Sequence, residues 1–379
     1  MKNNKSILHI VNTFYAVTYF IGDQFLYFKD KGYDLHVICS PSDRMESYSK
    51  SKGFKYEDIP LLRSISITQD IKSLIQICRY IKKNNIGIIV GHTPKGGLLA
   101  MIAGKLMRVP KRIYFRHGLV YETSSGFIRQ LLIFAEKLTS CCATKIICVS
   151  PSLMKRSVED RLNPEYKQLI LGEGTCGGID SEEKFNPHKI NTDKLNALRQ
   201  SLNIIKNDIV IGYCGRLVKD KGIKKLVETL KILPENYKLL LVGDFEERDA
   251  LKNDLQEEIT QNNKIIKTGF IFNDIEYYYA LMSVFILPSY REGFPTSTLE
   301  ASSMQIPVLT TKVTGCIDAI IDGETGYYIS HDPQDIKANI IKLQNKELRD
   351  KLGYNGRQFV LNNFDNRILW PIIEKELYI

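Results

Sequence analysis

The chain has 379 residues, of which 44% are apolar and 25% are charged; such a chain is long enough for two domains of a soluble globular protein. It contains no uninterrupted run of about 18–20 apolar residues, which argues against a membrane-spanning helix. The apolar segment after the first six residues is shorter than a secretory signal, so we expect a cytoplasmic protein.

The net charge of +9 is unevenly distributed along the chain. Residues 1–180 carry 26 Lys and Arg against 15 Asp and Glu, whereas the remaining 199 residues carry 26 and 28. A basic first half indicates an anionic partner. Because no nucleic-acid recognition motif is present, we expect an anionic membrane surface or a phosphorylated acceptor. A solvated basic face remains the alternative.

The eight cysteines form no Cys-x-x-Cys pair, and the six histidines show no spacing typical of a metal site. Most of the cysteines lie in apolar surroundings. This pattern favours free, buried thiols over disulfides or metal ligands. We therefore predict no metal and no cofactor.

The first half alternates short β-rich runs with helical patterns, which predicts a parallel sheet covered on both faces. The predicted strands are Ile7–Val11, Leu35–Cys39, Ile86–Val90, Arg112–Phe115 and Ile146–Val149. The predicted helices include Asp70–Lys83, Gly97–Met107 and Phe127–Leu138.

The second half repeats this alternation. Its predicted strands are Ile209–Cys214, Lys238–Val242, Ile265–Thr268, Val284–Leu287 and Val308–Thr311. Its predicted helices are Ile223–Leu230, Glu246–Thr260, Asp274–Met282, Thr296–Ser303 and Pro333–Asn345. The chain is therefore expected to form two Rossmann-like, doubly wound α/β domains that face a cleft, where ligands of such folds bind.

The expected domain boundaries follow composition. Residues 1–180 form the first domain. The stretch Gly172–Asn207 is rich in Gly, Asn, Asp and Lys and has no strong period, so we expect residues 181–205 to form a linker. Residues 206–357 form the second domain. Residues 358–379 look like a C-terminal helix, which we expect to cross back to the first domain.

Two acids, Glu292 and Glu300, frame the predicted start of a helix behind the strand Val284–Leu287. A helix N-terminus is a ready phosphate site, and Pro295 suits its first turn because proline lacks an N–H. Carboxylates around a phosphate site suit a nucleotide sugar, whose hydroxyls they can bind. The residues between the acids that take part in this hypothesis are Gly293, Phe294, Thr296 and Ser297. A capped surface helix with two unrelated acids is the plain alternative.

Two cations, Arg216 and Lys221, lie in a glycine-bounded loop, Gly215–Gly222, after the first strand of the second domain. Such cations can neutralise a diphosphate leaving group as its charge develops. Gly243 and Phe270 follow the next two strands, where a nucleotide base would rest, although a glycine at a strand end is usually only a turn.

The first half offers weaker candidates. Arg116 and His117 follow the strand Arg112–Phe115, and a histidine at this place suits proton handling or a hydrogen bond to a sugar hydroxyl. His92 and Lys95 lie in an earlier strand-to-helix turn, after the strand Ile86–Val90. There Lys95 and the following glycines can bind an acceptor phosphate. A structural histidine and a simple turn are the alternatives.

Together these motifs resemble the family 4 retaining glycosyltransferases of GT-B fold, over nearly the whole chain. The resemblance is strongest in Gly215–Gly222 and in Phe285–Ala301, and the segments His92–Gly97, Arg112–Gly118 and Cys148–Ser150 look like bacterial members that build capsule, O-antigen and exopolysaccharide.

The resemblance implies a UDP-sugar donor, a retaining and metal-independent transfer, and a polyprenyl-diphosphate-linked acceptor at the inner face of the cytoplasmic membrane. It assigns the diphosphate to Arg216 and Lys221, the ribose to Glu300, and the distal phosphate to Thr296 and Ser297. It assigns the sugar to Glu292, to the amides of Gly293 and Phe294, and to His117. The implied mechanism is a front-face displacement in which the leaving phosphate helps to deprotonate the acceptor.

The chain departs from the family pattern after its first strand. Many members carry a Gly-Gly pair there, whereas this chain reads as an aromatic loop, Asn12–Tyr19, with no glycine before Gly22. We expect this loop, including Thr13, to shape the acceptor site instead. Two other functions remain open: a catalytically silent GT-B scaffold of a polysaccharide assembly complex, and a GT-B epimerase or phosphorylase.

Overall fold

The computed structural model describes residues 5–62, 64 and 66–379. Residues 1–4, which belong to the chain start used above to infer a cytoplasmic protein, lie outside the described part. The chain forms two compact units. The first comprises the chain up to Gly178 together with Arg367–Ile379, and the second comprises Ile179–Asn366.

The first unit contains a seven-stranded parallel sheet in the order β3-β2-β1-β4-β5-β6-β7. Its strands are β1 (Ser6–Ile10), β2 (Asp34–Cys39), β3 (Lys55–Asp58), β4 (Ile88–Gly91), β5 (Lys111–Arg116), β6 (Lys145–Cys148) and β7 (Gln168–Leu169). The five strands predicted for this half are confirmed within two residues at each end, and β3 and β7 were missed. The central strands are buried along their whole length, which explains their apolar sequences.

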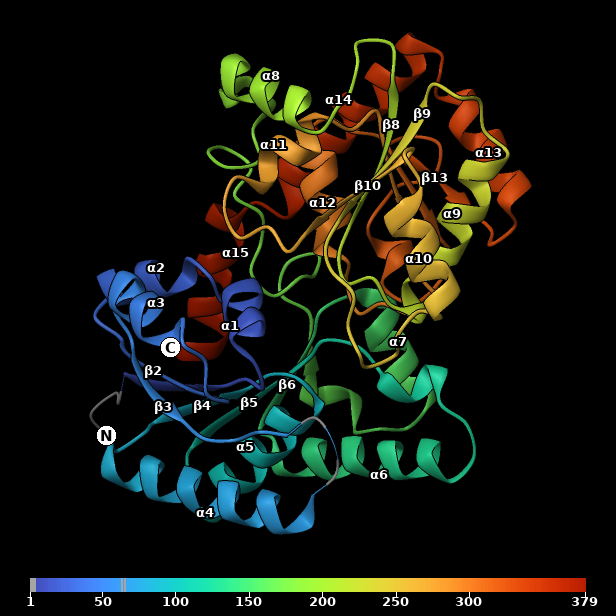
Figure 1. Cartoon of the computed structure of the whole chain (residues 1–379). Helices are drawn as coiled ribbons and strands as arrows, with labels where there is room; N and C mark the ends of the chain where they lie inside the picture. Colours follow the sequence, from blue (N-terminus) through green and yellow to red (C-terminus); the bar gives the residue numbers. More distant parts are fainter. Residues whose placement is uncertain (1–4, 63, 65) are drawn as a thin grey trace. The chain divides into compact units, whose positions relative to one another are not determined.

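Helices cover both faces of the first sheet (Figure 1). One face carries α4 (Ile67–Lys83), α5 (Pro94–Leu106) and α6 (Gly126–Cys142), and α5 packs against both of the others. The other face carries α1 (Phe14–Phe20), α2 (Gln24–Asp30) and α3 (Met45–Lys52). The helix α7 (Pro151–Glu159) follows β6, with Ser150 as its N-cap.

The second unit contains a six-stranded parallel sheet in the order β10-β9-β8-β11-β12-β13. Its strands are β8 (Ile209–Cys214), β9 (Tyr237–Val242), β10 (Ile265–Gly269), β11 (Val284–Leu287), β12 (Val308–Thr311) and β13 (Gly326–Ile329). The flanking helices are α8 (Thr192–Ser201), α9 (Ile223–Lys231), α10 (Asn253–Gln261), α11 (Ile275–Ala280), α12 (Thr296–Ser303), α13 (Pro333–Lys342) and α14 (Lys346–Asn363). Two parallel-sheet α/β units of this kind confirm the predicted fold class.

Three predicted segments differ in the structure. The aromatic loop after β1 is a helix, α1, and the segment 181–205, expected to be an irregular linker, contains α8. The helix predicted from Glu246 begins only at Asn253. The reason is that residues before it pair with the loop after β8: the amide of Lys219 donates to the carbonyl of Asp249 (2.9 Å).

The C-terminal segment belongs to the first unit, as the predicted fold requires. It is α15 (Asn366–Ile373) followed by a π-helical turn, Glu374–Tyr378, and α14 before it belongs to the second unit. Trp370 Nε1 donates to the carbonyl of Gly177 (2.7 Å). The ring of Tyr378 is buried against Phe28, with ring centroids 4.9 Å apart.

All eight cysteines are free, as predicted. Five of them are buried, but Cys141 is exposed. Burial raises the pKa of Cys39 and of Cys176 to about 12, which keeps these thiols protonated and unreactive near neutral pH.

Candidate active site

The strand order of the second sheet places a topological switch point between β8 and β11. From β8 the chain builds β9 and β10 outward on one side, then returns to β11 on the other side. The loops that leave β8 and β11 therefore diverge at the carboxyl edge of the sheet, which is where doubly wound folds bind ligands. The two strongest sequence motifs, Gly215–Gly222 and Phe285–Ala301, lie at this point.

Glycines let these loops approach each other more closely than other residues would. A Cβ on Gly222 would lie 2.1 Å from the carbonyl oxygen of Pro288, so the loop after β8 rests directly on the loop after β11. A Cβ on Gly243 would lie 1.9 Å from the carbonyl oxygen of Gly215. Both glycines also have positive φ, +71° and +151°, which disfavours any L side chain.

The close loops bring Lys221 and Glu292 together although 71 residues separate them. The Lys221 ammonium donates to Glu292 Oε1, and the same oxygen accepts from the Ser289 hydroxyl at 2.8 Å. The two charged side chains are only 15% and 11% exposed, so the ion pair is largely shielded from water. A shielded pair of opposite charges at the switch point can bind a ligand that carries both anionic and hydroxyl groups.

Arg216 lies at the same edge, but its guanidinium pairs with a residue of another loop. It donates from one Nη to Glu246 Oε2 (2.9 Å), and the Arg216 side chain is 44% exposed. Glu246 lies in the irregular segment that was predicted to be helical. The Arg216 carbonyl accepts from the buried Tyr213 hydroxyl (2.8 Å), which fixes the backbone of the loop.

Glu300 lies in the second turn of α12 and is oriented by one hydroxyl. Tyr279 of α11 donates to Glu300 Oε2 at 2.6 Å. Burial raises the pKa of Glu300 above its ordinary value. A desolvated carboxylate held by one donor retains acceptor capacity for further hydroxyl groups.

The helix α12 begins at Thr296, as predicted, with Pro295 as the N-cap rather than in the first turn. The Pro295 carbonyl accepts from the Thr298 amide (3.1 Å). Thr296 and Ser297 are 8% and 9% exposed, and Phe294 packs on Phe364 at 5.3 Å between centroids. The first turn of α12 is thus held rigidly just behind the loop that carries Glu292.

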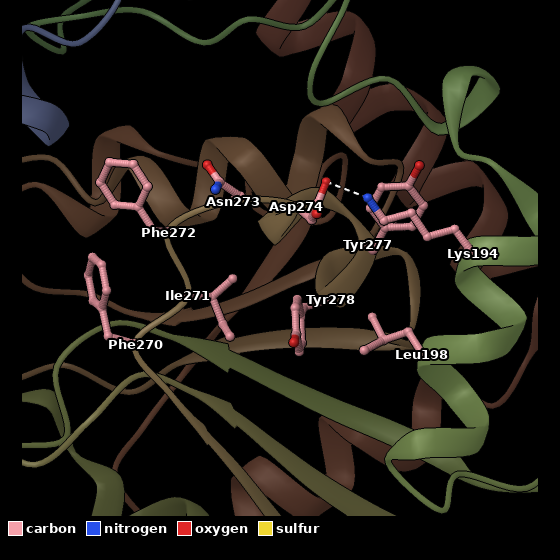
Figure 2. Close-up of a pocket in the computed structure, with 9 residues that line it drawn as sticks. All are labelled: Lys194, Leu198, Phe270, Ile271, Phe272, Asn273, Asp274, Tyr277 and Tyr278. Atoms are coloured by element: carbon pink, nitrogen blue, oxygen red, sulfur yellow. Dashed lines mark ion pairs between the residues drawn. The ribbon is translucent and has the colours of Figure 1, made fainter. Parts of the chain in front are cut away.

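Phe270 lies apart from this group, at one end of a cavity of about 390 Å³ (Figure 2). The rings of Phe270 and Phe272 lie 6.5 Å apart, and both are about half exposed. The ion pair between Lys194 and Asp274 (2.6 Å) closes the other end. Of the predicted site residues, only Phe270 lines this cavity.

The first unit places His117 in a chain of three hydrogen-bonded histidines. Nδ1 of His92 lies 2.9 Å from Nε2 of His117, and Nε2 of His92 lies 3.1 Å from Nδ1 of His9. Phe20, the last residue of α1, stacks on His117 with ring centroids 3.7 Å apart. Burial lowers the pKa of both His9 and His117 to about 3, so all three rings are neutral at physiological pH.

Arg116 does not lie at the site, which corrects the prediction that it faces the acceptor. Its side chain is fully buried and pairs with Glu136 of α6 (3.2 Å). It also donates to Gln168 (3.1 Å), Ser140 (2.8 Å) and Asn163 (3.0 Å). Its remaining N–H faces the Sγ of Cys148 (3.9 Å). With all five N–H groups engaged, the guanidinium has no donor left for a substrate and acts instead as an internal cross-link.

The turn after β4 also differs from its prediction. Lys95 forms an ion pair with Asp70 of α4, and its side chain is only 12% exposed. A Cβ on Gly97 would lie 2.4 Å from the ring of Tyr114, so this glycine serves close packing of α5 rather than phosphate binding. Thr13 is the N-cap of α1, and its carbonyl accepts from the amides of Ala16 (3.0 Å) and Val17 (3.2 Å).

Several residues of the site were not predicted. Ser289 and Tyr279 carry no distinguishing pattern in the sequence, because a hydroxyl becomes an orienting group only once the fold brings it to a carboxylate. His9 had a detectable signal, since it is a polar residue inside the apolar strand Ser6–Ile10. Phe20 directly follows the aromatic segment Asn12–Tyr19, whose helical form was missed.

The geometry of the glycine loops allows a direct test. Gly243→Ala should lower the free energy of unfolding by about 1–3 kcal/mol, because the added methyl group collides with Gly215 and φ is unfavourable. Thermal unfolding would measure this change. Gly323→Ala is the matched control, because φ there is +78° but nothing lies within 4 Å of the added Cβ. Equal stability of Gly243→Ala and Gly323→Ala would contradict the close contact between these loops.

Two family models match the chain. The model described as Glycosyl transferases group 1 matches residues 195–359, and the model described as Glycosyl transferase 4-like matches residues 6–150. The capsular polysaccharide biosynthesis glycosyltransferase CapM of Staphylococcus aureus is 35% identical over 379 residues, which covers 99% of this chain and 97% of that protein. The UDP-Gal:alpha-D-GlcNAc-diphosphoundecaprenol alpha-1,3-galactosyltransferase of Escherichia coli is 26% identical and covers 88% and 86%.

Solved structures share the fold over almost the whole chain. HepE of Anabaena in complex with UDP and glucose superposes with a TM-score of 0.83 at 19% identity, covering 98% of this chain and 99% of that one. WaaG, a glycosyltransferase involved in lipopolysaccharide biosynthesis, gives a TM-score of 0.74 at 18% identity, with coverage of 98% and 99%. These similarities establish the GT-B fold.

Proposed function

Because this chain belongs to the glycosyl transferase group 1 family, we propose that it transfers a hexose or N-acetylhexosamine from a UDP-sugar to a polyprenyl-diphosphate-linked glycan. The product would be a cell-surface polysaccharide such as capsule or O-antigen. The observation that carries this proposal is the shielded pair of Lys221 and Glu292 at the switch point of the second sheet. The names of the relatives from Staphylococcus aureus and Escherichia coli support the class of product and acceptor.

The donor roles follow from the charges and their positions. Arg216 and Lys221 bind the diphosphate, and the N-terminus of α12, at Thr296 and Ser297, binds the distal phosphate. Glu300 accepts from the ribose hydroxyls, and the base rests near Gly243 and Phe270. Glu292, the amides of Gly293 and Phe294, and His117 of the first unit bind the transferred sugar.

Lys221 links sugar binding to departure of the diphosphate in this proposal. Its ammonium is bonded to Glu292 before the donor arrives, so its charge is already positioned and partly desolvated. As the bond from the anomeric carbon to the phosphate oxygen breaks, Lys221 and Arg216 stabilise the negative charge that develops on the diphosphate. The acceptor oxygen bonds to the same face of that carbon, its proton passes to the leaving phosphate, and the configuration is retained.

This reaction has a direct assay. Incubation with a panel of nucleotide sugars and a polyprenyl-diphosphate glycan should give one glycosylated lipid with the donor's anomeric configuration, seen by mass spectrometry and NMR. Because two cations and a helix N-terminus neutralise the diphosphate, turnover should be unchanged in EDTA. A strict requirement for a divalent ion would overturn the metal-independent mechanism, and UDP binding without transfer to any acceptor would favour a silent scaffold.

The acceptor's lipid carrier requires a place where the protein meets the membrane. Among the described residues, no helix has both the length and the hydropathy needed to cross a bilayer. The outer surface of α4, α5 and α6, here called the α4–α6 face, instead exposes an unusual number of apolar side chains. They are Ile67, Ile71, Ile75, Leu106, Phe127, Ile128, Leu131, Phe134 and Leu138.

The charge of the α4–α6 face points to an anionic surface. On these three helices, every charged side chain that is exposed is basic; these residues are Lys72, Arg79, Lys82, Lys83, Lys105 and Lys137. The acidic residues there are engaged elsewhere, since Asp70 pairs with Lys95 and Glu136 with Arg116. Exposed aromatic and aliphatic groups surrounded by cations favour the headgroup region of an anionic leaflet. We therefore propose that the protein binds the inner side of the cytoplasmic membrane through this face.

Vesicle binding tests the docking face. The double variant Phe127→Ser and Phe134→Ser should lower the fraction bound to phosphatidylglycerol-containing vesicles by about tenfold, because two exposed rings no longer insert. Binding of the unaltered protein should weaken with salt and should be lost on neutral phosphatidylcholine. Tyr166→Ser, at a ring that is 84% exposed outside these helices, is the control. Equal binding by the double variant, or indifference to lipid charge, would contradict this docking face.

A further inference from the structure

The three hydrogen-bonded histidines of the first unit come from neighbouring strands at the switch point of its sheet. His9 lies on β1, His92 directly follows β4, and His117 directly follows β5. His9 and His92 are 3% and 2% exposed, whereas His117 is partly exposed. The row of three hydrogen-bonded histidines therefore runs from the interior of the domain to one ring, His117, that a ligand can reach.

The number of protons allows only two sets of tautomers for the three histidines. A neutral imidazole has one N–H, and each of the two hydrogen bonds needs one proton between its nitrogens. If His9 donates from Nδ1, then His92 donates from Nδ1 to His117, and Nδ1 of His117 must carry the remaining proton. If His117 donates from Nε2 instead, both bonds reverse and Nδ1 of His117 is a bare acceptor. The tautomer of the outermost ring is thus set by the innermost one.

The surroundings of His9 favour the first arrangement. In the reversed arrangement His9 carries its proton on Nε2, yet within the described part of the chain the only hydrogen bond of His9 is the one from Nδ1 to His92. An aromatic ring, Phe25, packs edge-on against it with centroids 5.9 Å apart. Among backbone groups, an N–H left without a partner is rarer than a carbonyl oxygen left without one, and the same preference applied to an imidazole favours a bare Nε2 on His9.

The rings are also held in place laterally. Phe115 stacks on His92 (5.1 Å between centroids), and Phe20 stacks on His117 (3.7 Å). Rotation of either imidazole would break both the stacking and the hydrogen bonds. Burial disfavours the cationic form of each of the three imidazoles, as the low pKa values of His9 and His117 indicate.

We propose that His9 and His92 are positioning residues that hold His117 in the tautomer that donates from Nδ1 to a hydroxyl oxygen of the transferred sugar. The part that concerns the sugar rests on the proposed function, whereas the ordering of the protons does not. The ring of His117 thus acts as a fixed donor and not as a general base in this reaction.

Nitrogen-15 NMR of the full-length protein, labelled at histidine, tests the ordering without any substrate. Long-range proton–nitrogen correlations should show three neutral rings, with the proton of His117 on Nδ1; assignment uses His117→Gln. A proton on Nε2 of His117, or a cationic ring at pH 7, would overturn the inference. Because this spectrum needs no activity, a protein with the expected tautomers that transfers no sugar would contradict the proposed function alone.

Two nearly isosteric variants separate positioning from simple packing. His9→Asn keeps a donor for His92, so the tautomer should persist and kcat should stay within about threefold. His9→Asp offers an acceptor instead, which should move the proton of His117 to Nε2 and lower kcat by about tenfold, the size expected for one lost hydrogen bond. Thermal unfolding identifies any variant that fails to fold, in which case the spectrum of the unaltered protein decides. An unchanged His117 tautomer in folded His9→Asp would contradict the inference.

Discussion

Glu292→Gln should lower kcat by about 100-fold or more while UDP affinity stays equal or becomes slightly tighter. The carboxylate is assigned to the transferred sugar, and loss of one preorganised polar contact to a reacting group has an effect of about this size. UDP affinity is spared because Lys221, released from its ion pair, has its full charge available for the diphosphate. Initial-rate kinetics and calorimetric titration with UDP would measure the two effects.

Glu235→Gln is the matched control for this variant, because the side chain of Glu235 is 94% exposed on the same unit. It should leave both quantities unchanged. If Glu292→Gln has the kcat of the unaltered enzyme, Glu292 does not contact the sugar. If it loses UDP affinity instead of kcat, the carboxylate serves to hold Lys221 in place and the assignment to the sugar is wrong.

Lys221→Met should lower kcat/KM by about 1000-fold, and it should weaken UDP binding as well. The substitution removes a cation assigned to the leaving diphosphate. Within the described part of the chain, it leaves Glu292, only 11% exposed, with the Ser289 hydroxyl as its remaining hydrogen-bond partner. An uncompensated carboxylate close to the diphosphate repels it, so the loss should exceed that of a neutral contact.

Lys219→Met, two residues earlier and exposed, separates this effect from a general loss of positive charge and should change kcat/KM by less than about twofold. The double variant Lys221→Met and Glu292→Gln should bind UDP more tightly than Lys221→Met alone, since the repulsion is gone. If the changes in UDP binding free energy of the two single variants simply add in the double variant, the two side chains act independently. That result would contradict the coupling that the ion pair implies.

The sequence predicted the elements whose signal is local. Buried parallel strands such as Val284–Leu287 are short apolar runs between turn residues, and the structure has this strand at the predicted bounds. The segment from Glu246 was predicted wrongly because its helical composition is overridden by pairing with the loop after β8, which no local pattern encodes. The helix α1 was missed because its aromatic sequence does not give it a distinct polar face.

For the site, the sequence indicated which residues lie at strand ends but not which of them interact. Lys221 and Glu292 were both predicted from their loops, yet their ion pair depends on the contact between Gly222 and Pro288. Arg116 is the last residue of β5 and His117 follows it, but successive side chains of an extended segment point to opposite faces, and Arg116 points into the domain. A distinction of this kind needs knowledge of which face is covered.

The two crossings of the chain between its units lie side by side, since the amide of Ile179 donates to the carbonyl of Phe364 (2.8 Å). In topological terms the second unit is therefore an insertion within the first. During synthesis on the ribosome, the first unit remains incomplete until the whole of the second has been made. Until then Phe28 lacks its contact with the ring of Tyr378.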